Sequence, residues 1–183
     1  MFYAHIPISE ISRLTNLISL DLSDNFYELH DNVVMLALHM KEGVAGRLPQ
    51  NMTNLRQLYL DFVQIDSPVP IHFANLSCLT HLSLQDCNLH GKVPNSIGNL
   101  KSLNILYLYP CRFFGVIPSS IGNLTELIDL RLWKNGFSGQ IPYSLGNLTW
   151  LEVLIFASNS FSGKLPISVP PRVENQSNVR RTI

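Results

Sequence analysis

The sequence is poor in charged residues, and the charges that it has cancel. Only 14% of its 183 residues are charged, with 13 basic residues against 13 acidic ones. Without a basic cluster, little electrostatic attraction draws the chain toward nucleic acid or anionic lipid, so both are excluded as expected partners. Apolar residues make up 46%, which excludes a disordered polyelectrolyte. At this length one domain with a sizeable core is expected.

Cysteine is also scarce. Cys78, Cys87 and Cys111 are too few and odd in number for a disulfide framework, and they lack the paired spacing of a zinc site. The six histidines show no ligand spacing, so neither a metal nor a cofactor is expected. No nucleophile elbow, zinc-protease motif, phosphate loop or kinase motif is present in the sequence. We therefore expect a protein that is not an enzyme.

Long apolar runs are missing as well. The longest uninterrupted one, Val33 to Leu38, is far shorter than the about 20 residues that cross a bilayer. The first residues, from Met1 to Pro7, lack the basic stretch and apolar core of a signal peptide. The expectation is that this segment neither inserts into a membrane nor carries an export signal.

What the sequence does contain is a 24-residue repeat. Apolar residues recur at that interval in three columns: Leu55, Leu79, Leu103, Leu127 and Leu151; Leu58, Leu82, Leu106, Leu130 and Leu154; Leu60, Leu84, Leu108, Leu132 and Phe156. A fourth column holds Val63, Cys87, Cys111, Asn135 and Asn159. An earlier row has Leu17, Leu20, Leu22 and Asn25 in the same relative places.

Each row predicts one short strand and one short turn. Leucines two residues apart point the same way, so each row supplies one strand of a parallel sheet whose leucines are buried between rows. The Asn amide can satisfy backbone groups of the adjoining coil, where Cys is a small buried substitute and Val63 offers no hydrogen bond. Gly followed three residues later by Pro, as in Gly91 to Pro94, predicts a turn with positive φ. The Ser-Ile-Gly-Asn-Leu stretch at 96–100 predicts a helical turn that ends at its Gly.

The composite L-x-x-L-x-L-x-x-N-x-L-x-G-x-I-P-x-x-L-G-N-L resembles the plant-specific class of leucine-rich repeat, over residues 48–166 and partly over 14–25. Residues 76–124, with Asp86-Cys87-Asn88-Leu89 inside, are similar to the ectodomains of plant receptor-like proteins. The resemblance implies an α/β repeat fold: a right-handed leucine-rich-repeat solenoid, with a parallel β-sheet on the concave face and short helical or 3-10 turns on the convex side. It also implies a location at the extracellular side of the plasma membrane or in the apoplast, and a segment of a longer protein.

The regularity of the repeat divides the chain into three parts. Residues 1–47 are expected to form a degenerate first repeat and an irregular insertion, residues 48–169 the regular array, and residues 170–183 a disordered tail. Within the insertion, residues 33–40 have two interpretations: a displaced helix on the convex side, or an ordinary loop, which is the plainer one.

The candidate ligand site lies between and after the core leucines of two neighbouring rows. Because adjacent strands lie about 4.8 Å apart, Tyr107 is expected beside Arg131 and Tyr109 beside Trp133, with Asp129 placed to pair with Arg131. Tyr, Trp and Arg are enriched at interface hot spots, so these five residues are predicted to bind a protein or peptide ligand on the concave face. The alternative is cross-strand pairing that only stiffens the sheet.

Five N-x-S/T sequons, at Asn51, Asn75, Asn123, Asn147 and Asn175, predict glycosylation if the protein is exported. A disulfide between Cys87 and Cys111, one repeat apart, is an alternative to their role as buried substitutes for Asn.

The leading functional hypothesis is extracellular recognition in plant defence or development, with signalling through a partner or co-receptor kinase. The alternatives are a soluble inhibitor of a cell-wall-degrading enzyme, similar to polygalacturonase-inhibiting proteins, and a truncated, non-signalling gene product.

Overall fold

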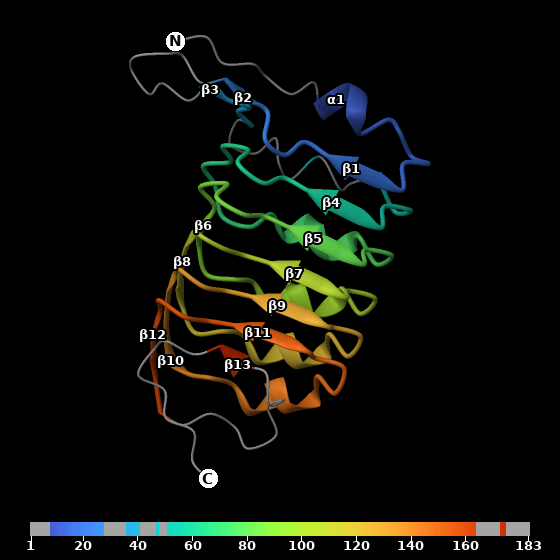
Figure 1. Cartoon of the computed structure of the whole chain (residues 1–183). Coiled ribbons are helices and arrows are strands. Elements are labelled where there is room, and N and C mark those ends of the chain that lie inside the picture. Colours follow the sequence, from blue (N-terminus) through green and yellow to red (C-terminus); the bar gives the residue numbers. More distant parts are fainter. Residues whose placement is uncertain (1–7, 28–35, 41–46, 48–50, 164–172, 175–183) are drawn as a thin grey trace.

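The structure, a computed structural model, describes residues 8–27, 36–40, 47, 51–163 and 173–174. Its main feature is a seven-stranded parallel sheet in which strands from successive rows lie side by side (Figure 1). In spatial order the strands are β1 (Ser19–Asp21), β4 (Gln57–Tyr59), β5 (His81–Ser83), β7 (Ile105–Tyr107), β9 (Asp129–Arg131), β11 (Val153–Ile155) and β13 (Val173–Glu174). The predicted solenoid and its parallel sheet are confirmed.

The register of the large sheet follows the sequence repeat. Leu58 pairs with Leu82, Leu82 with Leu106, and Leu106 with Leu130, always one row apart. All of these leucines are fully buried. Fully burying one such side chain stabilises the fold by about 1.5–3 kcal/mol before its entropy cost, so the leucine columns form the core that holds the rows together.

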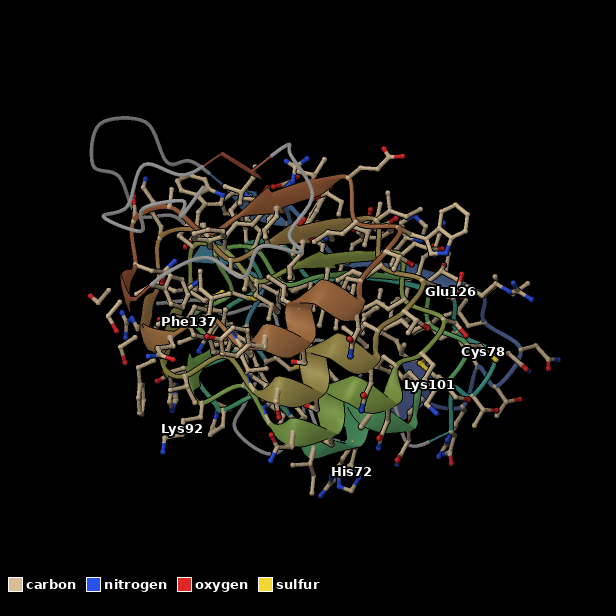
Figure 2. All side chains as sticks on the ribbon, turned by 90° about the horizontal axis from the view of Figure 1, so that it is seen from below. His72, Cys78, Lys92, Lys101, Glu126 and Phe137 are labelled. Carbon is tan, nitrogen blue, oxygen red and sulfur yellow. The ribbon has the colours of Figure 1, made fainter. Side chains whose placement is uncertain are left out.

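Short 3-10 turns cover the side opposite to the large sheet: η2 (Ile71–Asn75), η3 (Asn95–Asn99), η4 (Ser119–Asn123) and η5 (Tyr143–Asn147) (Figure 2). Each is preceded by a Pro in extended conformation. The prediction that the glycine ends the turn is wrong, since Gly98 and Gly122 lie inside it. A Cβ on either residue would collide with the carbonyl oxygen of Ser120 or Ser144 in the next row, so these glycines permit close stacking of the turns.

A second, four-stranded parallel sheet flanks the stack, and the sequence did not predict it. It consists of β6 (His90–Gly91), β8 (Arg112–Gly115), β10 (Gly136–Gln140) and β12 (Ser160–Ser162). Gly91, Gly115, Gly139 and Gly163 have φ between +75° and +88°, as the Gly-to-Pro spacing predicted. Behind this sheet the rings of Phe113, Phe137 and Phe161 stack with centroids 6.1 Å apart, and Phe137 lies on this flank in Figure 2.

The Asn column satisfies backbone groups of the coil as predicted, and it also links neighbouring rows. The amide of Asn135 donates to the carbonyls of Leu132, in its own row, and Leu108, in the row before, at 3.1 and 2.6 Å. Its side-chain oxygen accepts the N–H of Phe113 at 3.2 Å. At Val63 no such side-chain bond is available, and the Val63 N–H donates to the Leu60 carbonyl at 3.1 Å instead.

The irregular N-terminal part adds a small hairpin. After the short α1 (Ile8–Ile11), β2 (Phe26–Tyr27) pairs antiparallel with β3 (Leu36–Ala37), and Met40 is buried in the core. The helix interpretation of residues 33–40 is therefore wrong for 36–40, because this backbone pairs with neighbouring strands; residues 33–35 lie outside the described residues. Of the predicted tail, only β13 is described, and it extends the large sheet.

Candidate ligand-binding site

The predicted site lies on the outer face of the large sheet, the predicted concave face. Tyr107 is the last residue of β7 and pairs in register with Arg131, the last residue of β9. Tyr109 and Trp133 follow two residues after each strand end, so they too meet across the rows. The structure thus brings all five predicted residues together, and we call Tyr107, Tyr109, Asp129, Arg131 and Trp133 the aromatic patch.

Asp129 organises one half of the aromatic patch. Its carboxylate accepts a hydrogen bond from the Tyr107 hydroxyl at 2.8 Å and from Arg131 Nη2 at 2.9 Å, with Arg131 Nε at 3.1 and 3.2 Å from its two oxygens. The Arg131 guanidinium also lies over the Tyr107 ring, 4.7 Å from its centroid. The expected neighbours and the expected ion pair are therefore both present.

These contacts perturb the ionisation of two groups. Burial, followed by the hydrogen bond to Asp129, raises the pKa of Tyr107 to about 12. The hydrogen bond to Asp129 is also the largest cause of the raised pKa of Arg131. Tyr107 therefore stays neutral and Arg131 stays charged over the physiological range.

One feature of the predicted patch needs correction. Asp129 was expected on the solvent-facing side of the sheet, but it is only 8% exposed. Tyr107 and Arg131 cover it, so Asp129 positions these two side chains and offers little surface of its own to a ligand.

Tyr109 and Trp133 form the other half of the patch. Their ring centroids are 5.1 Å apart with 31° between the planes, and Tyr109 meets Tyr107 edge-on at 5.7 Å. Lys134, which sequence reasoning missed, places its ammonium group 4.9 Å from the Trp133 ring centroid. Lys134 itself has a left-handed backbone, with φ of +52°, and from this conformation its side chain reaches the ring. The repeat pattern does not predict that conformation, so the only signal in the sequence was the position of Lys134 directly after Trp133.

A second polar cluster, also missed, lies on the same face two to three rows away. Asp61 accepts hydrogen bonds from the Ser83 hydroxyl at 2.5 Å and from the Gln85 N–H at 2.8 Å. Burial is the largest cause of the raised pKa of Asp61, and the charges of Asp24 and Asp21 add to it. Asp61 occupies the same column of the repeat as Tyr109 and Trp133, and this position was the signal in the sequence that could have identified it.

Four of the five sequons lie in one column. Asn75, Asn123 and Asn147 are the last residues of η2, η4 and η5, and Asn51 is one row before Asn75. All four are exposed, and Asn175 lies outside the described residues. The described residues contain no group of three or more His, Cys, Asp or Glu side chains that would hold a metal ion, and no helix among them is long and apolar enough to cross a bilayer.

Comparison with known proteins assigns the repeat. Residues 78–100, 102–124 and 126–148 each match the Leucine Rich Repeat family. These three rows of the chain are therefore leucine-rich repeats. The chain is 37% identical to Receptor-like protein 6 of Arabidopsis thaliana over 89 residues, which are 47% of the chain and 8% of that protein.

Solved plant receptor ectodomains share the fold of this chain. The ectodomain of the Arabidopsis thaliana receptor kinase GASSHO1/SCHENGEN3, in complex with CASPARIAN STRIP INTEGRITY FACTOR 2, matches 91% of it with a TM-score of 0.78 and 32% identity. The Arabidopsis receptor kinase HAESA, in complex with the peptide hormone IDA and the co-receptor SERK1, matches 90% with a TM-score of 0.73 and 32% identity. The chain spans only 18% and 25% of these two structures. The fold of the chain is therefore that of plant leucine-rich-repeat receptor ectodomains.

Proposed function

We propose that this chain is a recognition segment of a plant extracellular receptor, which binds a peptide or protein ligand at the aromatic patch. The observation that carries the proposal is a continuous set of contacts on the open face of the large sheet: Trp133 meets Tyr109, Tyr109 meets Tyr107, and the fixed Arg131 guanidinium lies over Tyr107. Solved relatives such as HAESA bind peptide hormones, which supports the ligand class. Location at the extracellular side of the membrane or in the apoplast is part of this proposal.

The aromatic patch has the properties of a preorganised hot spot. Tyr and Trp supply large contact areas with few rotatable bonds, and their neighbours in the sheet already fix their orientation. Two of the three ring contacts join different rows, so a ligand lying across β7 and β9 meets a surface that loses little entropy on binding.

Arg131 supplies the charge that a ligand would meet. Its Nε and Nη2 are directed at Asp129, whereas no hydrogen bond joins its Nη1 to another described residue. A guanidinium held in this way presents its remaining N–H groups in a fixed direction, which suits a carboxylate or a backbone carbonyl of a peptide. Lys134 adds a second positive charge beside Trp133.

A second protein is part of the proposed signalling, because HAESA was solved together with a co-receptor. We therefore propose that a ligand bound at the aromatic patch contributes to the assembly of this receptor with a partner kinase.

The binding proposal is tested by selecting short random peptides, displayed on phage, against the immobilised 183-residue chain. Peptides enriched on the wild type are then measured against Trp133→Ala and Tyr143→Ala. Tyr143 is the matched control, because it is an aromatic residue that is 80% exposed and lies on the opposite side, in η5. We expect Trp133→Ala to weaken binding at least tenfold and Tyr143→Ala to leave it unchanged.

Urea titration first establishes that both chains are folded. Equal binding of the enriched peptides to Trp133→Ala and to the wild type would then overturn the proposed site. Failure to enrich any peptide above the level of an unrelated repeat protein would count against peptide recognition itself.

Glycosylation of the sequon column is the second part of the proposal. Enzymatic deglycosylation of the natural protein, extracted from its own tissue, is expected to lower its apparent mass on a gel. An unchanged mass, at the value of the unmodified chain, would contradict passage through the secretory pathway and with it the extracellular location.

A further inference from the structure

Cys87 and Cys111 occupy the same place in neighbouring rows of the solenoid, where the next two rows have Asn135 and Asn159. The adjoining strands β6 and β8 are paired in parallel, with His90 opposite Arg112. Paired strands lie about 4.8 Å apart, and a disulfide needs Cα atoms about 4.4–6.8 Å apart. Because His90 and Arg112 are 22 residues apart and the two cysteines 24, this pairing does not itself place Cys87 opposite Cys111. Their proximity follows from the contacts of their sulfur atoms.

The side chains of the two cysteines point to the same place. The Cys87 Sγ donates to the carbonyl oxygen of Leu84 at 2.7 Å, and the Cys111 Sγ donates to the same oxygen at 3.1 Å. Two sulfur atoms held by one oxygen cannot be farther apart than the sum of these two distances. Both are free thiols in this structure.

The thiols link their rows less well than Asn does. Asn135 reaches two carbonyls in two rows and accepts the N–H of Phe113. Cys87 and Cys111 share one carbonyl, and sulfur is a weak acceptor for a backbone N–H. A covalent bond between the two sulfurs would restore a strong link between these rows.

The two thiols differ in accessibility. Cys87 is 0% exposed, and burial followed by the neighbouring Cys111 raises the pKa of its thiol well above the ordinary value. Cys111 is only partly buried, so an oxidant reaches it first. Cys78 is exposed but lies on the flank opposite to Phe137, away from this column (Figure 2).

We propose that Cys87 and Cys111 form an oxidisable pair that closes to a disulfide between neighbouring rows. The thiolate of Cys111 attacks one sulfur of a low-molecular-weight disulfide, such as oxidised glutathione, and releases one thiol. The thiolate of Cys87 then attacks the Cys111 sulfur in the mixed disulfide and releases the second thiol. The protein loses two electrons and two protons, and the small disulfide is reduced to two thiols.

The experiment incubates the folded chain with oxidised glutathione, blocks remaining thiols by alkylation, and maps tryptic peptides without reduction. Trypsin leaves Cys78 and Cys87 together in peptide 57–92 and Cys111 in peptide 102–112. The Cys78→Ser variant is therefore used beside the wild type, because any link between these peptides in that variant must join Cys87 to Cys111. Wild-type chain oxidised in urea is the matched control. In the unfolded chain the loop between Cys78 and Cys87 is shorter than the loop between Cys87 and Cys111, so pairing of Cys78 with Cys87 is favoured.

Linked peptides 57–92 and 102–112 in folded Cys78→Ser, together with a higher urea midpoint for the oxidised chain, would support the proposal. A stable glutathione adduct on Cys111 that never yields the link would overturn it. So would complete alkylation of both cysteines after oxidation, or a link that forms only in urea.

Discussion

Tyr107 and Asp129 belong to neighbouring strands, and the hydroxyl of the first donates to the buried carboxylate of the second at 2.8 Å. Because Asp129 also accepts hydrogen bonds from Arg131, a single carboxylate fixes an aromatic ring and a guanidinium from two rows. The face of the large sheet at this point is ordered by a polar contact beneath it and not only by the leucine core.

Asp129→Ala is expected to destabilise the chain by about 1–2 kcal/mol. The change removes the hydrogen bonds to Tyr107 and Arg131 and leaves a partly buried guanidinium without its counter-charge. Solvent screens the exposed side of Arg131, which keeps the loss small. Urea unfolding measures the difference.

Asp66→Ala is the control for Asp129→Ala. Asp66 lies 3.7 Å from His90 in an exposed pair, for which a loss of less than about 0.5 kcal/mol is expected. Equal effects of the two substitutions would show that burial of Asp129 does not determine its contribution.

The raised pKa of Tyr107 predicts a loss of stability at alkaline pH. In the unfolded chain Tyr107 ionises near its ordinary pKa of 10, whereas in the folded chain its pKa is about 12. The folded state therefore retains the proton longer, and this contribution, fully present below pH 10, is lost as the pH rises toward 12. Urea midpoints measured between pH 9 and 12 should fall less steeply for Tyr107→Phe than for the wild type. Identical slopes would contradict the assignment.

Asp61 predicts a pH dependence on the acidic side. Burial raises its folded pKa, so its contribution to stability is present at low pH and falls as the pH rises from the ordinary value through the raised one. Asp61→Asn keeps an oxygen that can accept from Ser83 and Gln85 and removes the repulsion from Asp21 and Asp24. We expect this variant to be at least as stable as the wild type at pH 7 and to show a flatter profile above pH 4. A clear loss at pH 7 would mean that the negative charge itself is needed there.

The regular rows of the fold could be predicted from the sequence because one period governs every level of the structure. The positions of Leu58, Leu82 and Leu106 predict strands, their burial and their register together, since a shift of one residue would expose all of them. Where the period fails, between Asn25 and Leu48, an irregular insertion was predicted but its two strands were not. Strand β3 pairs with β2, and this pairing leaves no periodic signal in so few residues.

For the candidate site, the sequence predicts which residues are neighbours but not how deeply each side chain is buried. Column positions place Tyr107 beside Arg131 and Tyr109 beside Trp133, because stacked rows keep their register. Burial of Asp129 depends on how its neighbours fold over it, and the reach of Lys134 depends on a left-handed backbone. Neither follows from the repeat pattern.

Gly122→Ala is expected to destabilise the chain by about 2–3 kcal/mol, the upper part of the range for overpacking. The added methyl group would collide with the carbonyl oxygen and Cβ of Ser144 in the next turn, so η4 and η5 would have to separate. Urea unfolding again provides the measurement. Ser119→Ala, in the same turn but with an exposed side chain, is the control and should change stability little. A Gly122→Ala chain as stable as Ser119→Ala would mean that the turns are not closely stacked.

Asn135→Ala tests the polar link between rows and is expected to cost about 2–3 kcal/mol. The substitution leaves the carbonyls of Leu108 and Leu132 and the N–H of Phe113 without their side-chain partner. Asn135→Cys should cost less, because a thiol donates to one carbonyl, as Cys87 does to Leu84. Unfolding free energies in the order wild type, Cys, Ala would confirm that hydrogen bonding determines this column. If Cys and Ala were equally destabilising, the thiol contact would contribute nothing, and the two cysteine rows would be held by their leucines alone.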